Sequence, residues 1–297
     1  GGALWRGGHL QGRGMSTQVE SLRRFLAGRA PAHGAETGTA LVVGSGKGGV
    51  GTSTLAALIA LRAVEEGRRA LLVDGEENPG TLHMLLGVEA GPGLGALRGG
   101  TVSPEALMVP VVTGLELVTG WPAGEESELG AAERRALLRR VSGSYGAFDR
   151  VIVDAGSRLD GVLGACGAGA RRLLAVSGSD RVSLAATHAL IKAVSARLPR
   201  LPIAVLFNGC DDAEARGAFE VLRTGVGHFL ARAVDFAGSI PEDPALRQAV
   251  GAGSTLTEAA ASSPITSAVH GLDPRVLFEG MTGPRLARFV TIPHAKG

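Results

Sequence analysis

Short apolar runs recur along the chain, and longer stretches with helical spacing of apolar residues lie between them. Buried strands are predicted at 39–43, 69–73, 115–118, 150–153, 172–176 and 203–207. Helices are predicted at 52–66, 131–142, 182–198 and 213–222. Because strands alternate with helices, we expect an α/β fold of three layers, in which helices cover both faces of a mostly parallel central sheet.

The pattern changes towards the N-terminus. Residues 17–26 carry one apolar stripe at helical spacing and predict a short helix, which a linker rich in glycine, alanine and proline follows. Residues 1–14 precede the first Met, and we expect them to be a non-native or disordered extension. We therefore expect four parts: the N-terminal extension 1–14, the helix and its linker 15–38, the α/β domain 39–268, and the C-terminal tail 269–297.

The C-terminal part is less regular. Gly280, Gly283 and Pro284 interrupt any helix there, although apolar residues occur on both sides of them. Two interpretations stay open for this tail: it docks back onto the core, or it forms a weakly amphipathic helix that contacts a membrane surface. No apolar run in the chain approaches the ~18–20 residues that span a bilayer.

Composition narrows the function further. The 30 basic and 28 acidic residues nearly cancel, so the composition gives no strong signal of nucleic-acid binding. Its two cysteines, Cys166 and Cys210, are far apart and form no CxxC pair. We therefore expect no disulfide and a cytoplasmic, reducing location.

A glycine-rich loop between the first predicted strand and the first predicted helix carries the strongest chemical signal. Backbone N–H groups of such a loop wrap a phosphate, and the N-terminus of the following helix favours the same anion. Ser53 offers a hydroxyl to Mg²⁺, whereas Thr52 stands where the common phosphate loop has its lysine. The expected nucleotide contacts are Gly46, Lys47, Gly48, Gly49, Val50, Gly51, Thr52, Ser53 and Thr54.

Polar residues follow three of the predicted strands. Asp74 and Asp154 each end a strand, where a carboxylate can hold Mg²⁺. Glu76 lies two residues beyond Asp74 and could reach an attacking water, and the amide of Asn208 can pair with a base edge. Each of these residues could also be an ordinary turn former or a solvated loop residue.

Together these residues resemble the MinD/ParA family of deviant P-loop ATPases. The loop from Ser45 to Thr54 matches the family pattern S-G-K-G-G-V-G-K-[ST]-[TN], except at Thr52. A second block begins at Asp74, with Glu76 where the family has aspartate. A third block begins at Asp154, with Arg158 in place of a glycine.

The resemblance implies a P-loop NTPase fold, ATP and Mg²⁺ as cofactors, and a homodimer with ATP sandwiched between the protomers. Lys47 matches the signature lysine that reaches the phosphates of the partner. Ser53, Asp74 and Asp154 would serve the metal, and Glu76 would orient the water. Two further residues would contact the adenine: Asn208, and Pro241 in a late G-x-I-P-x-D segment.

One feature resembles the FlhG (FleN) branch of the family, which regulates flagellar number. Residues 17–23 keep the glutamine, leucine and arginine of a D-Q-A-x-x-L-R motif, here Gln18, Leu22 and Arg23. In that branch the motif activates an FlhF-like GTPase. The resemblance thus implies a switch that controls a polar structure such as the flagellum, with peripheral contact at the inner face of the membrane or the pole.

Departures from the family pattern weaken the case for catalysis. A charge-assisted hydrogen bond contributes roughly 1.5–3 kcal/mol, so losing the lysine at position 52 would cost ~10- to 150-fold. Glu76 moves its carboxylate by about one methylene, and a misplacement of ~1 Å can cost ~100-fold in rate. Two alternatives therefore stay open: a non-hydrolysing scaffold of the TadZ/CpaE pilus-positioning kind, and a ParA-like partitioning ATPase.

Overall fold

The computed structural model describes residues 39–76, 80–121, 130–260 and 263–279. Every described residue belongs to one compact unit, which lies within Thr37–Gly297. The helix expected at 17–26, with Gln18, Leu22 and Arg23, lies outside the described residues, as does the tail beyond residue 279.

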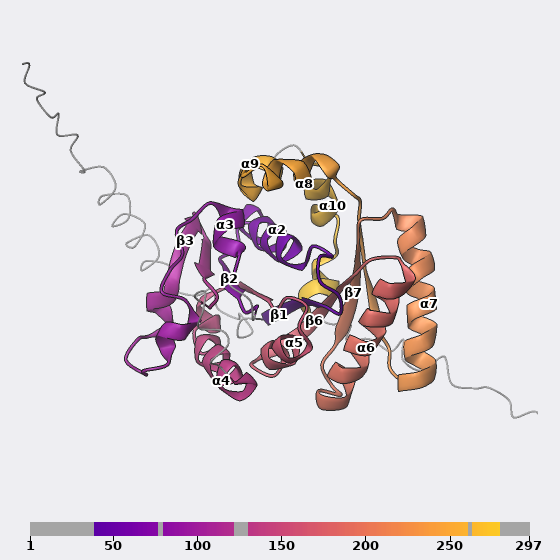
Figure 1. The fold of residues 1–297 in the computed structure, drawn as a ribbon, viewed down its shortest axis with the longest axis horizontal. Helices are drawn as coiled ribbons and strands as arrows, with labels where there is room; N and C mark the ends of the chain where they lie inside the picture. Colours follow the sequence, from indigo (N-terminus) through magenta and orange to yellow (C-terminus); the bar gives the residue numbers. More distant parts are fainter. Residues whose placement is uncertain (1–38, 77–79, 122–129, 261–262, 280–297) are drawn as a thin grey trace, which may run out of the picture. The chain divides into compact units, whose positions relative to one another are not determined.

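An eight-stranded sheet forms the middle of this unit, in the order β3-β4-β2-β5-β1-β6-β7-β8 (Figure 1). All neighbouring strands are parallel except the edge strand β3, which is antiparallel to β4. The strands are β1 (Thr39–Ser45), β2 (Ala70–Asp74), β3 (Met108–Val112), β4 (Leu115–Val118), β5 (Arg150–Asp154), β6 (Ala170–Ser177), β7 (Ile203–Asn208) and β8 (Asp235–Ile240).

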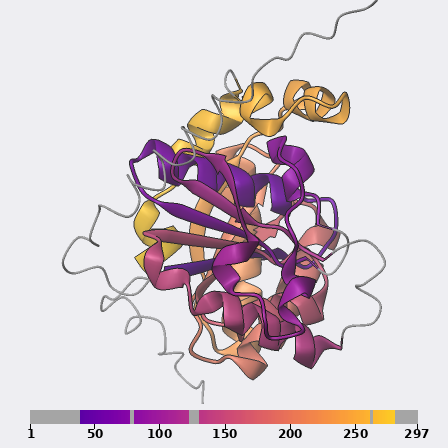
Figure 2. The ribbon, with the colours of Figure 1, turned by 90° about the vertical axis from the view of Figure 1, so that its left-hand side faces the viewer.

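Helices cover both faces of the sheet, as Figures 1 and 2 show. One layer contains α4 (Ala131–Ser142), α5 (Leu159–Cys166), α6 (Arg181–Arg197) and α7 (Asp212–Leu230). The other layer contains α2 (Thr52–Glu65), α3 (Leu82–Leu86), α8 (Pro244–Gly251), α9 (Leu256–Ala260), α10 (Pro264–His270) and the π-helix η5 (Arg275–Glu279). Short 3-10 turns lie at η1 (Leu94–Leu97), η2 (Pro104–Leu107) and η4 (Tyr145–Ala147).

An apolar core lies on each face of the sheet, and alternate residues of a strand pack into one core or the other. In β1, Ala40 and Val42 pack into one apolar cluster, whereas Leu41 and Val43 pack into the other. All four side chains are buried, because successive residues of a strand point to opposite faces and both faces are covered. The predicted three-layer α/β fold is therefore confirmed.

Several elements differ from the prediction. The strands β3 and β8 were not predicted, since β3 contains Pro110 and β8 contains Gly238, residues that weaken a strand pattern. The helix predicted at 213–222 extends to Leu230 as α7, although glycines interrupt its pattern. The glycine-rich stretch at 91–100 contains the 3-10 turn η1.

The order of the strands places the loop after β1 at a reversal of chain direction across the sheet. From β1 the chain first builds the strands on one side and then crosses to β6, on the other side. Ligands of open α/β sheets bind beyond the carboxyl ends of the strands at such a point. The glycine-rich loop occupies this position.

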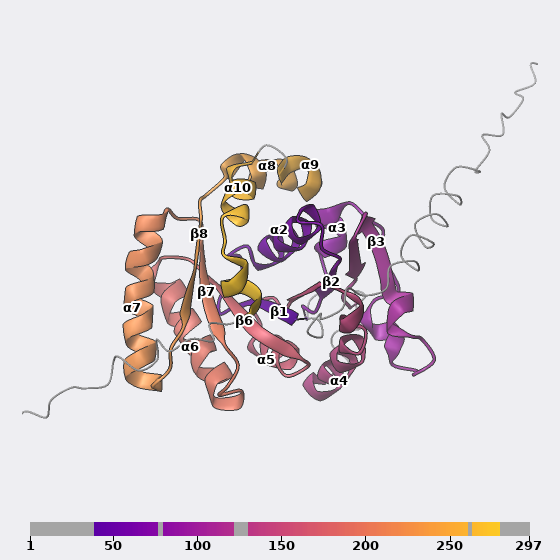
Figure 3. The same ribbon diagram turned by 180° about the vertical axis from the view of Figure 1, so that it is seen from behind.

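Two buried arginines fasten the segment 269–279 to the sheet. Arg62 of α2 donates to the carbonyl oxygens of Val269 and Leu272 at 2.7 and 2.8 Å. Arg172 of β6 donates to the carbonyl oxygen of Val276, and η5 contacts β1, β6 and β8 (yellow in Figure 3). None of the described helices is both long and apolar enough to cross a membrane.

Candidate nucleotide-binding site

The glycine-rich loop is shaped to receive an anion. Gly49 and Gly51 adopt left-handed backbone conformations with φ of 77° and 87°, which glycine reaches without the strain of a side chain. Gly51 is also the N-cap of α2, whose first turn contains no acidic residue. The positive end of the helix therefore meets the loop without a nearby carboxylate on its own first turn.

Close packing against α6 explains another glycine of the loop. A Cβ added to Gly46 would lie 2.3 Å from the carbonyl oxygen of Ala186 and 2.9 Å from the backbone nitrogen of Thr187. Both contacts are with backbone atoms, which cannot rotate away. Gly46 therefore lets the loop lie directly on the middle of α6.

Hydroxyl groups close the base of the loop. Thr52 is buried, and its hydroxyl donates to the hydroxyl of Ser45 at 3.0 Å. The hydroxyl of Ser45 donates in turn to the carbonyl oxygen of Lys47 at 3.0 Å. We call this arrangement of Thr52, Ser45 and Lys47 the hydroxyl chain. It turns the Thr52 hydroxyl hydrogen towards the inside of the loop, and the predicted contact of Thr52 with nucleotide stays a prediction.

Lys47 contacts the N-terminus of α6 in its own protomer. Its ammonium donates to the hydroxyl of Ser183 at 3.3 Å and lies 3.6 Å from a carboxylate oxygen of Asp180. Asp180 caps α6, and the hydrogen bond from Ser183, together with the Lys47 charge, lowers the pKa of Asp180 to about 2. Because both charged side chains are about half exposed, the ion pair is weak enough to exchange for another partner.

Two buried carboxylates lie side by side at the carboxyl ends of β2 and β5. Asp74 and Asp154 are paired in register, and each is only 1% exposed. Burial, and then the charge of Asp154, raise the pKa of Asp74 to about 7. Burial also raises the pKa of Asp154, against hydrogen bonds from Ser53 and from the backbone of Gly156.

The donor set fits a hard divalent cation. One oxygen of Asp74 and one of Asp154 have no hydrogen-bond partner among the described residues. Carboxylate and hydroxyl oxygens are the ligands that Mg²⁺ takes in phosphate-binding sites. Buried like charges are costly without a compensating cation, so these two residues and Ser53 suit Mg²⁺.

Glu76 lies at the same edge of the sheet. A Cβ on Gly156, whose φ is 61°, would lie 2.7 Å from Cγ of Glu76, so the glutamate side chain packs directly on that backbone. Burial and the charge of Asp154 raise the pKa of Glu76. Three of the predicted site residues, Asp74, Glu76 and Asp154, are therefore brought together.

Asn208 approaches the loop from the end of β7. Its amide nitrogen donates to the carbonyl oxygen of Val50 at 2.8 Å, and it lies 2.5 Å from where a Cβ on Gly51 would be. Asn208 pairs with Ile240 at the end of β8, so Pro241 follows at the same edge. One amide hydrogen and the amide oxygen of Asn208 remain for a base.

Sequence reasoning missed the residues that hold the predicted ones in place. Asp180 and Ser183 contact Lys47, and a Cβ on Gly80 would lie 2.2 Å from an oxygen of Asp74. An aspartate just before a predicted helix is an N-cap signal, so Asp180 could have been found as a cap. Its contact with Lys47, 133 residues earlier in the chain, carries no local signal.

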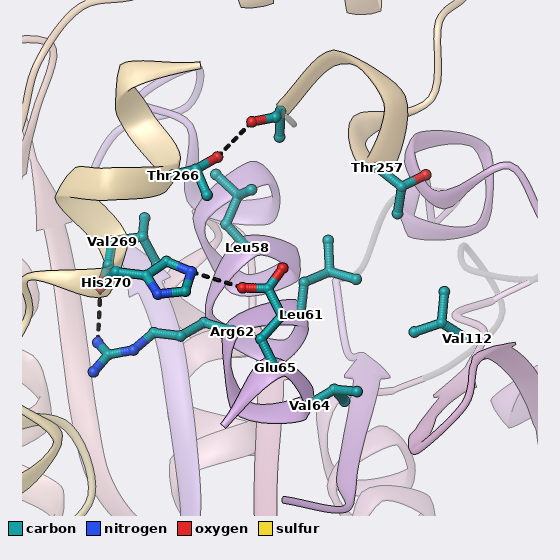
Figure 4. A pocket seen from close by; sticks show the side chains of 11 residues that line it. Leu58, Leu61, Arg62, Val64, Glu65, Val112, Thr257, Thr266, Val269 and His270 are labelled. Atoms are coloured by element: carbon teal, nitrogen blue, oxygen red, sulfur yellow. Dashed lines mark hydrogen bonds and ion pairs between the residues drawn. The ribbon is translucent and has the colours of Figure 1, made fainter. Parts of the chain in front are cut away.

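A separate cavity of about 250 Å³ lies near the opposite end of α2 (Figure 4). Leu58, Leu61 and Val64 form much of its wall, together with residues of α9 and α10. At this cavity Nε2 of His270 lies 2.7 Å from a carboxylate oxygen of Glu65. It contains none of the predicted site residues.

The strand, the glycine loop, the helix and the two buried carboxylates together define a P-loop fold. MinD of Pyrococcus furiosus has the same fold, with a TM-score of 0.65 and 22% identity over 78% of this chain and 95% of that one. MinD of Pyrococcus horikoshii, solved with Mg-ADP, has a TM-score of 0.64 and 20% identity over 78% of this chain and 92% of that one. A Borrelia burgdorferi plasmid partition protein bound to AMPPNP has a TM-score of 0.62 and 17% identity over 79% of this chain and 96% of that one.

In sequence, the chain is similar to the antiactivator FleN of Pseudomonas aeruginosa. The two are 25% identical over 213 residues, which is 71% of this chain and 76% of FleN. No protein-family model matches the chain. The predicted resemblance is confirmed: the chain has the fold of MinD and ParA proteins and is similar in sequence to FleN.

Proposed function

We propose that the protein is a switch that binds ATP and Mg²⁺, closes as a homodimer, and regulates the position or number of a structure such as the flagellum. One observation carries the nucleotide site: the glycine loop and two buried carboxylates with unpartnered oxygens lie at one edge of the sheet. The similarity to FleN, named as an antiactivator, supports a regulatory function.

Each residue has a defined part in this proposal. The backbone of residues 46–51 binds the phosphates, and Asn208 with Pro241 holds the adenine. Ser53, Asp154 and Asp74 hold Mg²⁺, which supplies positive charge to the phosphate oxygens. Glu76 orients a water, and its raised pKa makes it a better proton acceptor than an ordinary glutamate.

Dimerisation depends on Lys47 in this proposal. Its contacts with Asp180 and Ser183 are exposed, so ATP in a second protomer can compete for the ammonium. We expect Lys47→Ala to abolish the dimer that sedimentation detects with Mg-ATP. Lys192→Ala, an exposed lysine on α6, is the matched control and leaves the dimer intact. A dimer of normal affinity in Lys47→Ala would refute the role of Lys47.

Turnover separates the switch from a second candidate, a non-hydrolysing scaffold. The hydroxyl chain at Thr52, in the place of a lysine, favours that second candidate, because no cation stands there. Release of labelled phosphate that falls about 100-fold in Asp154→Ala would support the switch. Tight ATP binding without any turnover would support the scaffold.

A FlhF-like GTPase is the partner we propose for the N-terminal segment. The full chain should raise GTP hydrolysis by the cognate GTPase, and Arg23→Ala should remove that effect. Arg24→Ala, the adjacent arginine outside the motif, is the control. If the full chain leaves the GTPase unchanged, only a general positioning function remains, and DNA binding that depends on ATP would favour partitioning instead.

A further inference from the structure

The side chain of Thr52 is buried inside the loop. Thr52 is 8% exposed, and its hydroxyl hydrogen is donated to Ser45, which is 1% exposed. Ser45 donates its own hydrogen to the backbone of Lys47. The hydroxyl hydrogens of Thr52 and Ser45 are therefore both donated to acceptors within the protein.

The hydroxyl chain acts on the backbone and leaves the charge of the loop unchanged. A hydrogen bond to the Lys47 carbonyl fixes the orientation of the peptide unit that follows it, and this unit carries the N–H of Gly48. In phosphate loops such N–H groups surround the α- and β-phosphates, whereas the usual lysine reaches the β- and γ-phosphates. The hydroxyl chain thus supports the contacts that ADP and ATP share.

The side-chain charges at the site also offer little attraction to a third phosphate. Lys47 is ion-paired with Asp180 of its own protomer, and the side chains of Asp74, Glu76 and Asp154 beside the loop are acids that supply no positive charge. A γ-phosphate brings further negative charge into this surrounding. Without a lysine at position 52, the third phosphate gains little from a single protomer.

We propose that Thr52 makes the loop of a single protomer bind Mg-ADP and Mg-ATP with similar affinity, so that preference for ATP arises only when a second copy of the chain contributes Lys47. This inference rests on the proposed function and deepens it. It assigns the discrimination between the two nucleotides to the dimer and makes the isolated protomer a general adenine-nucleotide binder.

Calorimetric titration of the full chain with Mg-ADP and Mg-AMPPNP tests the proposal, at concentrations where sedimentation shows a monomer. The two dissociation constants should agree within ~3-fold, which is less than half a decade in affinity. In Thr52→Lys the ratio should shift at least ~10-fold towards AMPPNP, the lower end expected for one charge-assisted hydrogen bond.

Two variants test whether the hydroxyl acts through the backbone. Thr52→Val and Ser45→Ala each break the hydroxyl chain from a different end, and both should weaken ADP and AMPPNP by the same factor, about 5-fold. Thr52→Ser keeps the hydroxyl and should bind like the original protein. Thermal melting of each variant verifies that it folds.

Two results would overturn the inference alone. The first is a monomer that prefers AMPPNP over ADP by more than ~10-fold, since that requires a contact with the γ-phosphate within one protomer. The second is a Thr52→Val variant that loses affinity for AMPPNP and keeps it for ADP. Absence of binding by either nucleotide would overturn the proposed function as well, so the two failures are distinguishable.

Discussion

The burial of Asp74 and Asp154 side by side destabilises the fold when both carboxyl groups are ionised. Both carboxyl groups are 1% exposed, and their residues face each other across β2 and β5. Burial opposes the ionised forms and raises both pKa values, and the charge of Asp154 raises the pKa of Asp74 further. Replacing Asp74 with asparagine keeps the size of the side chain and removes one of the two charges.

The sign of the effect follows from the protons bound in each state. Asp74 has a pKa of about 7 in the folded protein and 3.8 in the unfolded chain, so between these pH values the folded state holds a proton that the unfolded state has released. Stability therefore falls as pH rises through this window. At 1.36 kcal/mol per pH unit, the difference between 3.8 and about 7 amounts to about 4 kcal/mol.

Urea unfolding of the metal-free and nucleotide-free protein measures this directly. Between pH 5 and pH 8 the original protein should lose about 3 kcal/mol of unfolding free energy through Asp74. Asp74→Asn should lack this part of the decrease and be the more stable protein at pH 8. Asp212→Asn, at an exposed position on α7, is the control and should keep the original pH dependence.

Equal pH dependence in Asp74→Asn and in the original protein would refute the reasoning. It would mean that the pair is already relieved, for example because Asp154 alone carries the proton. Mg-AMPPNP adds a second readout. Cation binding compensates the carboxylates, so the ligand should stabilise the original protein more at pH 8 than at pH 5.

Two further predictions concern the supports of the site. Arg62→Met leaves the buried carbonyl oxygen of Leu272 without a donor among the described residues, whereas that of Val269 still accepts from the N–H of Leu272. Urea unfolding should show a loss of about 1–3 kcal/mol, against less than ~0.5 kcal/mol for the exposed control Arg216→Met. Gly46→Ala forces a Cβ onto the backbone of Ala186 and should cost about 1–3 kcal/mol in thermal unfolding. Gly48→Ala, whose Cβ would have only an ordinary contact, should melt near the original temperature, and equal melting of Gly46→Ala would contradict the packing argument.

The sequence was sufficient for the features that depend on local pattern. The strands β1, β2, β4, β5, β6 and β7 were predicted because each is a short apolar run that is buried on both faces. The gathering of Asp74, Glu76 and Asp154 was predictable as well. Parallel neighbouring strands bring their carboxyl ends to one edge, so acids that follow such strands must meet.

Long-range contacts were beyond the reach of pattern. Nothing near Arg62 indicates that it binds carbonyl oxygens more than 200 residues later, and nothing near Lys47 indicates Asp180. The same holds for Thr52, since a threonine in the place of a lysine indicates only a lost charge. Its hydrogen bond to Ser45 depends on how the loop closes.

The helix α2 connects the nucleotide loop to the C-terminal segment. Thr52 begins this helix at the loop, and Arg62 holds the carbonyl oxygens of Val269 and Leu272 near its other end. The C-terminal half of α2 also forms part of the wall of the cavity in Figure 4. A displacement of the loop that moves α2 as a rigid body must therefore also move the Arg62 contacts or break them. Breaking them would leave the buried carbonyl oxygen of Leu272 without its donor, so movement of the C-terminal segment together with α2 is the less costly response.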